Sequence, residues 1–162
     1  MTCSFGTAFG FHLQNSTQLN TQSGNGCNRW GWYETPTLAT LQAGGFSGPL
    51  LVGAGGNDIS AAIDVGTWTA TATLGGDVTV LYQLNFPPYS LADVHVDLVC
   101  TPLATCAPGQ YTFNSGPLPN LPSYLTPPLA LPYPNCSGGS EAALIVHASP
   151  VSRLQMDRIV ET

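Results

Sequence analysis

Carboxylate and imidazole side chains alternate along one segment of the chain, in a pattern that can bind a divalent metal ion. Asp93, His95 and Asp97 are each separated by one apolar residue, so in a β-strand they share one face at intervals of about 7 Å. Both groups are competent metal ligands, and His147 is a fourth candidate from a later segment. The competing interpretation is the solvated face of a strand whose opposite face is buried. We favour it, because three residues on one flat strand rarely converge on one ion.

A glycine-rich run offers a second metal candidate, for calcium. The run 53–56 is followed by Asn57 and Asp58, whose side-chain oxygens are hard ligands of the kind that Ca²⁺ prefers. It lacks the repeated acidic positions of an EF-hand loop, and a turn whose glycines adopt positive φ explains the same residues. No set of histidines and cysteines has the spacing of a structural zinc site. We therefore expect no cofactor and no tightly bound transition metal, with calcium as the open alternative.

Aromatic residues beside an arginine form a candidate platform for a sugar. Arg29, Trp30, Trp32 and Tyr33 lie within five consecutive positions. Aromatic faces stack on sugar rings, and a guanidinium group donates hydrogen bonds to hydroxyls. Alternation, however, puts Trp30 and Trp32 on the same face of a strand over 28–34, where β-sandwiches place their large aromatics. We expect both tryptophans in the core and Arg29 paired to an acid, with the sugar platform as the alternative.

Motifs of known catalytic sites are missing from the sequence. It contains no Gly-x-Ser-x-Gly elbow, no His-Glu-x-x-His, no P-loop and no dinucleotide-binding fingerprint. His12, His95 and His147 can still meet across sheets, which leaves an unknown hydrolase as the least favoured hypothesis. We expect a protein that is not an enzyme.

Five cysteines in a chain without lysine favour an oxidising compartment. A disulfide between Cys100 and Cys106 is predicted, because a five-residue spacer at the end of a strand permits the required Cα separation of about 5.5 Å. Cys3, Cys27 and Cys136 then supply at most one further bridge, and one thiol is left over.

The cysteines lead us to expect a secreted, extracellular location, and two sequons matter if secretion passes through an endoplasmic reticulum. They start at Asn15 and Asn135, which lie in expected loops and are candidate N-glycosylation sites.

Composition excludes several classes of partner. Three arginines against nine acidic residues give a net charge of −6, and a chain so poor in cations cannot neutralise a run of phosphates. Nucleic acid and anionic membrane surfaces are excluded on this ground. No apolar run approaches the roughly 20 residues of a transmembrane helix, so we expect no transmembrane segment. Hydrophobic residues make up 43% of the chain and charged residues 7%, which favours one packed domain.

Period-two alternation recurs along the chain and predicts an all-β fold. We expect an antiparallel β-sandwich of about seven to nine strands. The clearest signal is a hairpin over 67–84, in which Gly75-Gly76 joins two alternating runs by a tight turn. The other expected strands cover residues 4–13, 28–34, 91–100, 110–113 and 142–148.

Two segments depart from the strand pattern. Residues 116–136 hold seven of the 14 prolines and are expected to form an ordered loop that crosses one open side of the sandwich. The domain is expected to span 1–150 and a separate tail 151–162. Leu154, Met156 and Val160 in the tail suggest a strand donated to a neighbouring subunit. The alternative is a tail that is mobile or foreign to the native protein and has no role in assembly.

Several short motifs occur in an order that resembles a family of secreted or cell-surface β-sandwich domains of unassigned function. They are Thr7-Ala8-Phe9-Gly10, Asn28-Arg29-Trp30-Gly31-Trp32, Val52-Gly53-Ala54-Gly55, Asp93-Val94-His95, Ala107-Pro108-Gly109-Gln110-Tyr111 and Val146-His147-Ala148. The resemblance covers roughly residues 4 to 148 and implies a surface location but no known chemistry. The proline-rich loop and the tail depart from the family pattern.

Low charge, disulfides and a tail outside the sandwich favour an extracellular structural or adhesive module, which we expect to act as a self-assembling surface or filament subunit. The alternative is a secreted module for carbohydrate- or calcium-dependent binding. The expected partners are copies of the chain itself, another extracellular protein or a glycan.

Overall fold

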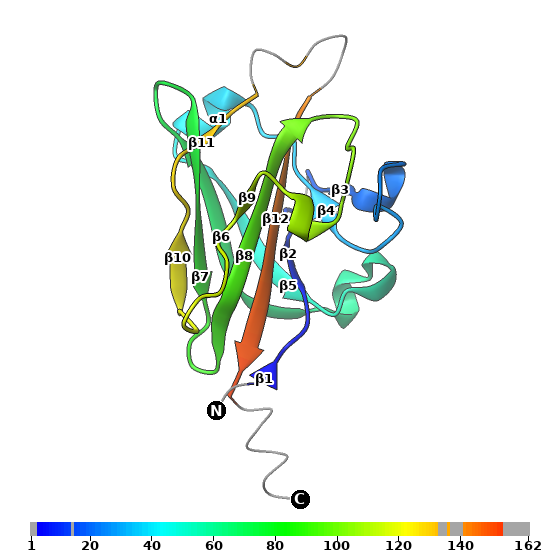
Figure 1. The fold of residues 1–162 in the computed structure, drawn as a ribbon, viewed down its shortest axis with the longest axis vertical. Helices are drawn as coiled ribbons and strands as arrows, with labels where there is room; N and C mark the ends of the chain where they lie inside the picture. The colour runs from blue at the N-terminus through cyan, green and yellow to red at the C-terminus, as the bar shows by residue number, and fades with distance from the viewer. Residues whose placement is uncertain (1–2, 14, 133–135, 137–140, 154–162) are drawn as a thin grey trace, which may run out of the picture.

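The computed structural model describes residues 3–13, 15–132, 136 and 141–153 (Figure 1). Antiparallel strands are the main regular structure of these residues and confirm the all-β prediction. The strands are β1 (Cys3–Ser4), β2 (Ala8–Gly10), β3 (Thr17–Gln18), β4 (Trp32–Tyr33), β5 (Phe46–Val52), β6 (Ile63–Ala72), β7 (Asp77–Leu84), β8 (Tyr89–Cys100), β9 (Phe113–Asn114), β10 (Ser123–Leu125), β11 (Leu129–Ala130) and β12 (Ala142–Ser152). The helical turns are η1 (Leu19–Thr21), α1 (Leu38–Gln42), η2 (Gly55–Asn57), η3 (Ile59–Ala61) and η4 (Pro108–Gln110). None of the helices in the described part of the chain is long and apolar enough to cross a membrane.

One curled sheet contains the long strands, in the order β10-β7-β6-β5-β2-β12-β8-β9. β12 pairs with other segments along both of its edges. β8 pairs along one edge, and β1, β2 and the single residue Glu34 pair one after another along the other edge. Figure 1 shows β8 and β12 running side by side through the middle of the molecule. A separate small sheet pairs β3 with β4.

The two ends of the curled sheet are joined through residues 118–125. Leu91 in β8 donates its N–H to the carbonyl of Leu121 at 2.8 Å, and Leu121 donates back to Leu91 at 3.1 Å. The next residues form β10, which pairs with β7 at the other end of the strand order. The two layers of the expected sandwich therefore belong to a single sheet that curls round its core.

The described part of the proline-rich segment, residues 116–132, packs against that core, as expected, but it also contains two strands where a loop was predicted. β10 and β11 both pair with β7. Proline lacks a donor but keeps its acceptor, and the carbonyl of Pro122 accepts a hydrogen bond from Leu84 N at 2.9 Å. Missing donors therefore do not prevent this segment from pairing with β7, because its carbonyl groups still accept hydrogen bonds.

The hairpin formed by β6 and β7 confirms the clearest sequence signal and corrects its turn. Thr73 N donates to Asp77 O at 2.9 Å, and Gly76 N donates to Thr73 O at 3.0 Å, so three residues rather than two form the loop. Gly76 adopts φ 92°, the positive value that a bulged three-residue hairpin requires. Leu74 is consequently at the loop tip and 95% exposed, outside the strand to which alternation assigned it.

Three expected strands are shorter than predicted. The segment 4–13 is divided into β1 and β2, with Gly6 at φ 82° between them. The segment 28–34 is reduced to β4, because Gly31 at φ 134° interrupts the extended backbone. The segment 110–113 is largely the end of η4 and the approach to β9.

Two hydrophobic cores lie on opposite faces of the sheet. The inner core fills the curl and includes Trp68 and Tyr82, both fully buried. The outer core lies between the sheet and a layer of loops, and it includes Phe9, Trp32 and Tyr111. β2 and part of β12 are therefore covered on both faces, which is why their sequences do not alternate cleanly between buried and exposed residues.

β12 continues to Ser152, two residues beyond the predicted domain boundary at 150. Its last residues still pair with β1 and β8. The guanidinium group of Arg153 then lies over the ring of Phe86, 5.6 Å from its centroid. The predicted donated strand in the tail lies outside the described residues.

Candidate binding groove

Polar residues of β8 share the outer face of the sheet, as alternation predicted, but this face is largely covered rather than solvated. Asp97 is buried, and its Oδ1 atom accepts hydrogen bonds from Thr112 N at 3.1 Å and Thr112 Oγ1 at 2.8 Å. The Asp97 carboxylate thus fixes the chain that enters β9. Asp93, four residues earlier, keeps partial exposure and lies 3.8 Å from His95 Nε2.

His147 in β12 stands directly opposite His95 in β8. The two rings stack with centroids 5.1 Å apart and planes inclined by 12°. Phe9 of β2 contacts the His147 ring by an edge, at a centroid distance of 5.0 Å. Burial, and then the neighbouring His95, lowers the pKa of His147 from 6.5 to about 3, and burial also lowers the pKa of His95. Both imidazoles are therefore neutral at pH 7.

The structure brings His95 and His147 together, but not in an orientation that suits a shared metal ion. A metal ion lies in the plane of each imidazole that binds it, and two nearly parallel planes do not meet at one ion, so the stacked His95 and His147 rings are poorly oriented for shared ligation. Asp97 is turned to Thr112. Within the described ranges no group of three or more histidine, cysteine, aspartate or glutamate residues could hold a metal ion.

The two calcium candidates point to different partners. Asn57 Oδ1 accepts a hydrogen bond from Gly31 N at 3.0 Å, which ties η2 to the loop before β4. Asp58 Oδ1 accepts from Ser60 N at 3.0 Å and Ser60 Oγ at 2.6 Å, and these bonds lower the pKa of Asp58. The Asn57 oxygen therefore braces a contact between two loops, and the Asp58 oxygen braces a local turn.

Both disulfides differ from the predicted pairing. Cys27 bonds to Cys106 and Cys100 bonds to Cys136, with Cα separations of 4.8 and 5.4 Å. The predicted Cys100–Cys106 bridge is wrong because Cys100 ends β8 at the sheet, whereas Cys106 packs with Cys27 inside the outer core. Cys3 is the free thiol, so the prediction that one cysteine would be left over is confirmed.

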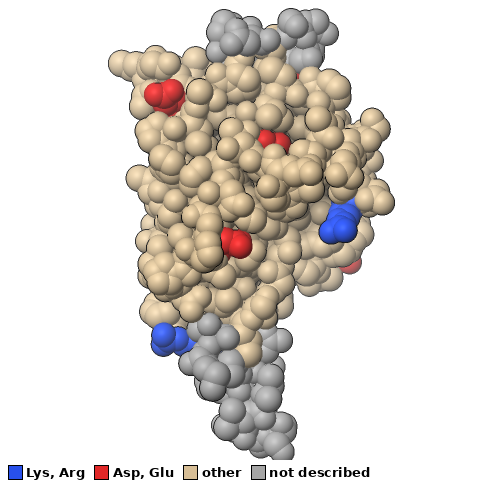
Figure 2. Space-filling model, viewed as in Figure 1, with Lys and Arg blue, Asp and Glu red and all other residues tan. Residues whose placement is uncertain are grey.

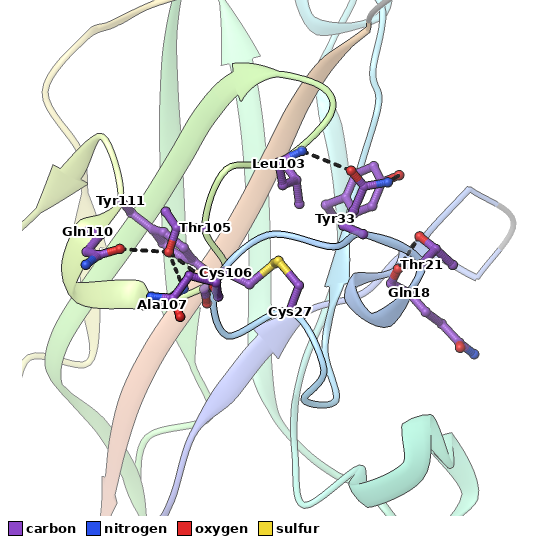
Figure 3. The surroundings of a disulfide bond; sticks show 12 residues. Gln18, Thr21, Cys27, Tyr33, Leu103, Thr105, Cys106, Ala107, Gln110 and Tyr111 are labelled. Carbon is purple, nitrogen blue, oxygen red and sulfur yellow. Dashed lines mark hydrogen bonds between the residues drawn. A yellow bond between two sulfur atoms is a disulfide. The ribbon is translucent and has the colours of Figure 1, made fainter.

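The Cys27–Cys106 bond connects the loops that cover the outer face (Figure 3). Around it, Cys106 N donates to Asn25 O at 2.8 Å, and the Tyr111 hydroxyl donates to the carbonyl of Cys106 at 2.9 Å. Gln22 Oε1 accepts from Leu103 N at 2.9 Å on the other side of the bridge. Residues 79 positions apart in the chain are thereby held as one layer.

A groove of about 610 Å³ lies between this layer and the outer face of the sheet. Phe9 and His147 contribute from the sheet, and the covering loops contribute Asn25, Arg29 and Trp30. The residues Ala107 and Pro108 lie beside the disulfide at its other border. Segments singled out separately in the sequence, including Arg29-Trp30 and His147, therefore meet at one place.

The residues of the predicted sugar platform differ in their burial, and only some of them line the groove. Trp32 and Tyr33 are 2% and 6% exposed, which confirms the core assignment for Trp32. Trp30 is only partly buried: it touches Phe9 and Trp32 by edge contacts and lines the groove. Arg29 is exposed and, among the described residues, makes no ion pair, so the expected pairing with an acid is wrong.

Sequence reasoning missed Glu34 as a buried acid. The residue is 1% exposed, Ser16 Oγ donates to its Oε1 at 2.6 Å, and its Oε2 has no hydrogen-bond partner. Burial raises the pKa of Glu34 from 4.5 to about 8. The sequence contained one signal of this burial, because the carboxylate directly follows the two aromatic residues of β4.

The two glycosylation candidates have different outcomes. Asn15 is exposed, with Nδ2 3.3 Å from His12 Nδ1, so its side chain is accessible. Asn135 lies outside the described residues.

No protein-family model, curated protein or solved structure matches this chain. The resemblance to secreted β-sandwich domains stays a prediction.

Proposed function

We propose that this chain is an extracellular structural or adhesive module, which acts by binding another extracellular molecule at the groove rather than by turning over a substrate. The observation that carries the proposal is the arrangement at the groove. Arg29 and Trp30 are accessible there, and their loop is fixed by the Cys27–Cys106 bond. A concave, pre-formed site with few polar groups suits binding, because little ordering entropy is lost when a ligand enters.

Two further features support an extracellular location. Two disulfides join distant parts of the described chain, and such bonds persist in oxidising compartments. The surface carries few charges, and Figure 2 shows acidic and basic atoms scattered singly over a face that is otherwise uncharged.

Localisation and adhesion can be tested together. Antibodies against the domain should label intact, unpermeabilised cells of the organism that makes it, and peptides from the isolated protein should contain both disulfides without prior oxidation. The purified domain should also bind the washed extracellular fraction of those cells. Labelling confined to permeabilised cells would contradict the proposal, and so would failure to bind any extracellular material.

Self-assembly is a second candidate function, supported by the position of Cys3. Its thiol is partly exposed and unbonded in β1, next to the end of β12 where the chain continues into residues 154–162. A contact between copies at this end would bring two such thiols together. Sedimentation of the native protein, a Cys3→Ser variant and a chain ending at 153 tests it. A monomer at every concentration, or oligomers unchanged by both alterations, would exclude this end as the assembly surface.

A further inference from the structure

We infer that the groove binds a neutral saccharide, which stacks on Trp30 and hydrogen-bonds to Arg29 and Asn25. The inference rests on the proposed function and names the ligand class of the same site. It is carried by the apolar surface, the exposed polar groups and the charge of the residues that line the groove.

Trp30 supplies the apolar surface. Its ring meets Phe9 at a centroid distance of 5.2 Å and an angle of 75°, and Trp32 at 5.8 Å and 69°. Two edge contacts with buried aromatics fix the orientation of the ring, while its partial exposure leaves surface available in the groove. An immobilised aromatic ring offers contact area at low entropic cost, which suits the C–H face of a sugar.

His147 lines the groove as a mostly buried, neutral ring. The residue is 4% exposed, and its Nδ1 atom is buried without a hydrogen-bond partner. Because that atom is shielded from solvent, a ligand in the groove meets the accessible part of the ring rather than Nδ1. The ring therefore adds contact surface to the groove without adding charge.

The charge of the groove favours an uncharged ligand. Arg29 is the one charged side chain among the described residues that line it. A cationic ligand finds no carboxylate in this lining, and an anionic ligand meets a single guanidinium on a chain of net charge −6. Sugar hydroxyls can accept from Arg29 and can both donate to and accept from the Asn25 amide. A purely hydrocarbon ligand would leave these polar groups unpaired.

The dimensions of the groove agree with this class. Its volume of about 610 Å³ lies within the roughly 300–1,000 Å³ of typical small-ligand sites. It lies along the outer face of the sheet rather than in the inner core, where Trp68 and Tyr82 fill the space. Part of an oligosaccharide can therefore enter while the remainder stays in solvent.

The test is a glycan array probed with the purified full chain. The array should present neutral oligosaccharides of hexoses and N-acetylhexosamines beside acidic ones that contain uronic or sialic acid. The best-binding glycan is then titrated by calorimetry against the native protein and the variants Arg29→Ala and Trp30→Ala. We expect each substitution to weaken binding at least tenfold, as for residues central to a binding site. Arg153→Ala is the matched control, because this arginine lies over Phe86, away from the groove lining, and it should bind like the native protein.

The outcomes separate the ligand class from the proposed function. Thermal melts first establish that each variant is folded, and Trp30→Phe, which keeps an aromatic face, should retain more affinity than Trp30→Ala. Binding to acidic glycans alone would overturn the neutral assignment, and binding unchanged by both groove variants would overturn the site. Failure of every glycan to bind at millimolar concentration would overturn the saccharide inference. If the domain still bound the extracellular fraction through Arg29 and Trp30, the proposed adhesive function would stand with a different ligand.

Discussion

His147 and His95 face each other across the β8–β12 pair, with their rings stacked 5.1 Å apart and a buried, unpartnered Nδ1 atom on each. Two imidazoles in this position cannot both be protonated without repulsion in a poorly solvated site. The fold therefore depends on their remaining neutral, and this dependence makes stability sensitive to acid.

The first prediction concerns that sensitivity. The pKa of His147 is about 3 in the folded protein against 6.5 for the free group, so the unfolded chain takes up the proton first as pH falls. The stabilising contribution is complete above pH 6.5 and is lost toward pH 3, at about 1.4 kcal/mol per pH unit. In His147→Gln, the free energy of unfolding, measured by urea titration at several pH values, should decrease less on acidification. A mutant curve parallel to the native one would show that His147 does not titrate in this way.

Glu34 gives the opposite dependence. Its pKa is about 8 in the folded protein and 4.5 when free, so the unfolded chain releases the proton first as pH rises. Stability from the protonated form is complete below pH 4.5 and is lost toward pH 8. Glu34→Gln should therefore raise the free energy of unfolding at pH 8 and change it little at pH 4.5, because glutamine can still accept from Ser16. Equal effects at both pH values would point to packing rather than ionisation.

Between pH 4.5 and 6.5, the contributions of Glu34 and His147 to the free energy of unfolding change in opposite directions with pH and offset each other. Substituting one of the two residues should therefore reveal the pH dependence that the other causes in this interval. His147→Gln should lose stability as pH rises through it, and Glu34→Gln should lose stability as pH falls.

Trp32 is the subject of the third prediction. It is 2% exposed in the outer core and contacts both Phe11 and Trp30. Trp32→Ala should lower the free energy of unfolding by roughly 3 to 5 kcal/mol, as expected for a large aromatic removed from a core. Trp30→Ala is the matched comparison and should cost less, because Trp30 is only partly buried. Guanidinium titrations of both variants measure the difference, and equal losses would contradict the distinction between core and groove residues.

The strands with one buried face were accessible from sequence. In β7, the buried Val78, Val80 and Tyr82 alternate with residues that are more exposed. β2 lies within the strand predicted over 4–13, but its burial was misjudged, because it lies between two cores and Ala8 and Phe9 are both buried. An alternating pattern predicts one buried face and does not reveal that the second face is covered as well.

The candidate site was only partly accessible from sequence. Arg29, Trp30 and His147 were named for their chemistry, whereas Pro108 was named only within a motif of the family resemblance and Asn25 carried no signal. Their meeting depends on a disulfide across 79 positions, and local spacing instead favoured the shorter loop between Cys100 and Cys106. Pairing over such a distance follows from the curl of the sheet, which the sequence pattern does not specify.

Thr126 lies between β10 and β11 in the chain and hydrogen-bonds to the edge of β7. Its backbone N donates to Val80 O at 3.0 Å, and its Oγ1 atom accepts from Val80 N at 2.9 Å. Pro127 and Pro128 follow directly and have no N–H to offer, so one residue serves both backbone groups of Val80. The threonine is 2% exposed, and water has little access to these bonds.

The last prediction is that Thr126→Val destabilises the protein although the two side chains have nearly the same shape. Valine removes the hydroxyl acceptor and leaves the buried N–H of Val80 unsatisfied, at a cost of roughly 1–3 kcal/mol. Thr126→Ser keeps the oxygen and is the matched control, with a smaller loss. Hydrogen exchange should locate the effect, since the Val80 amide should exchange faster in the valine variant than in the serine variant. Unchanged protection of that amide would show that the Thr126 hydroxyl does not hold the proline-rich segment to β7.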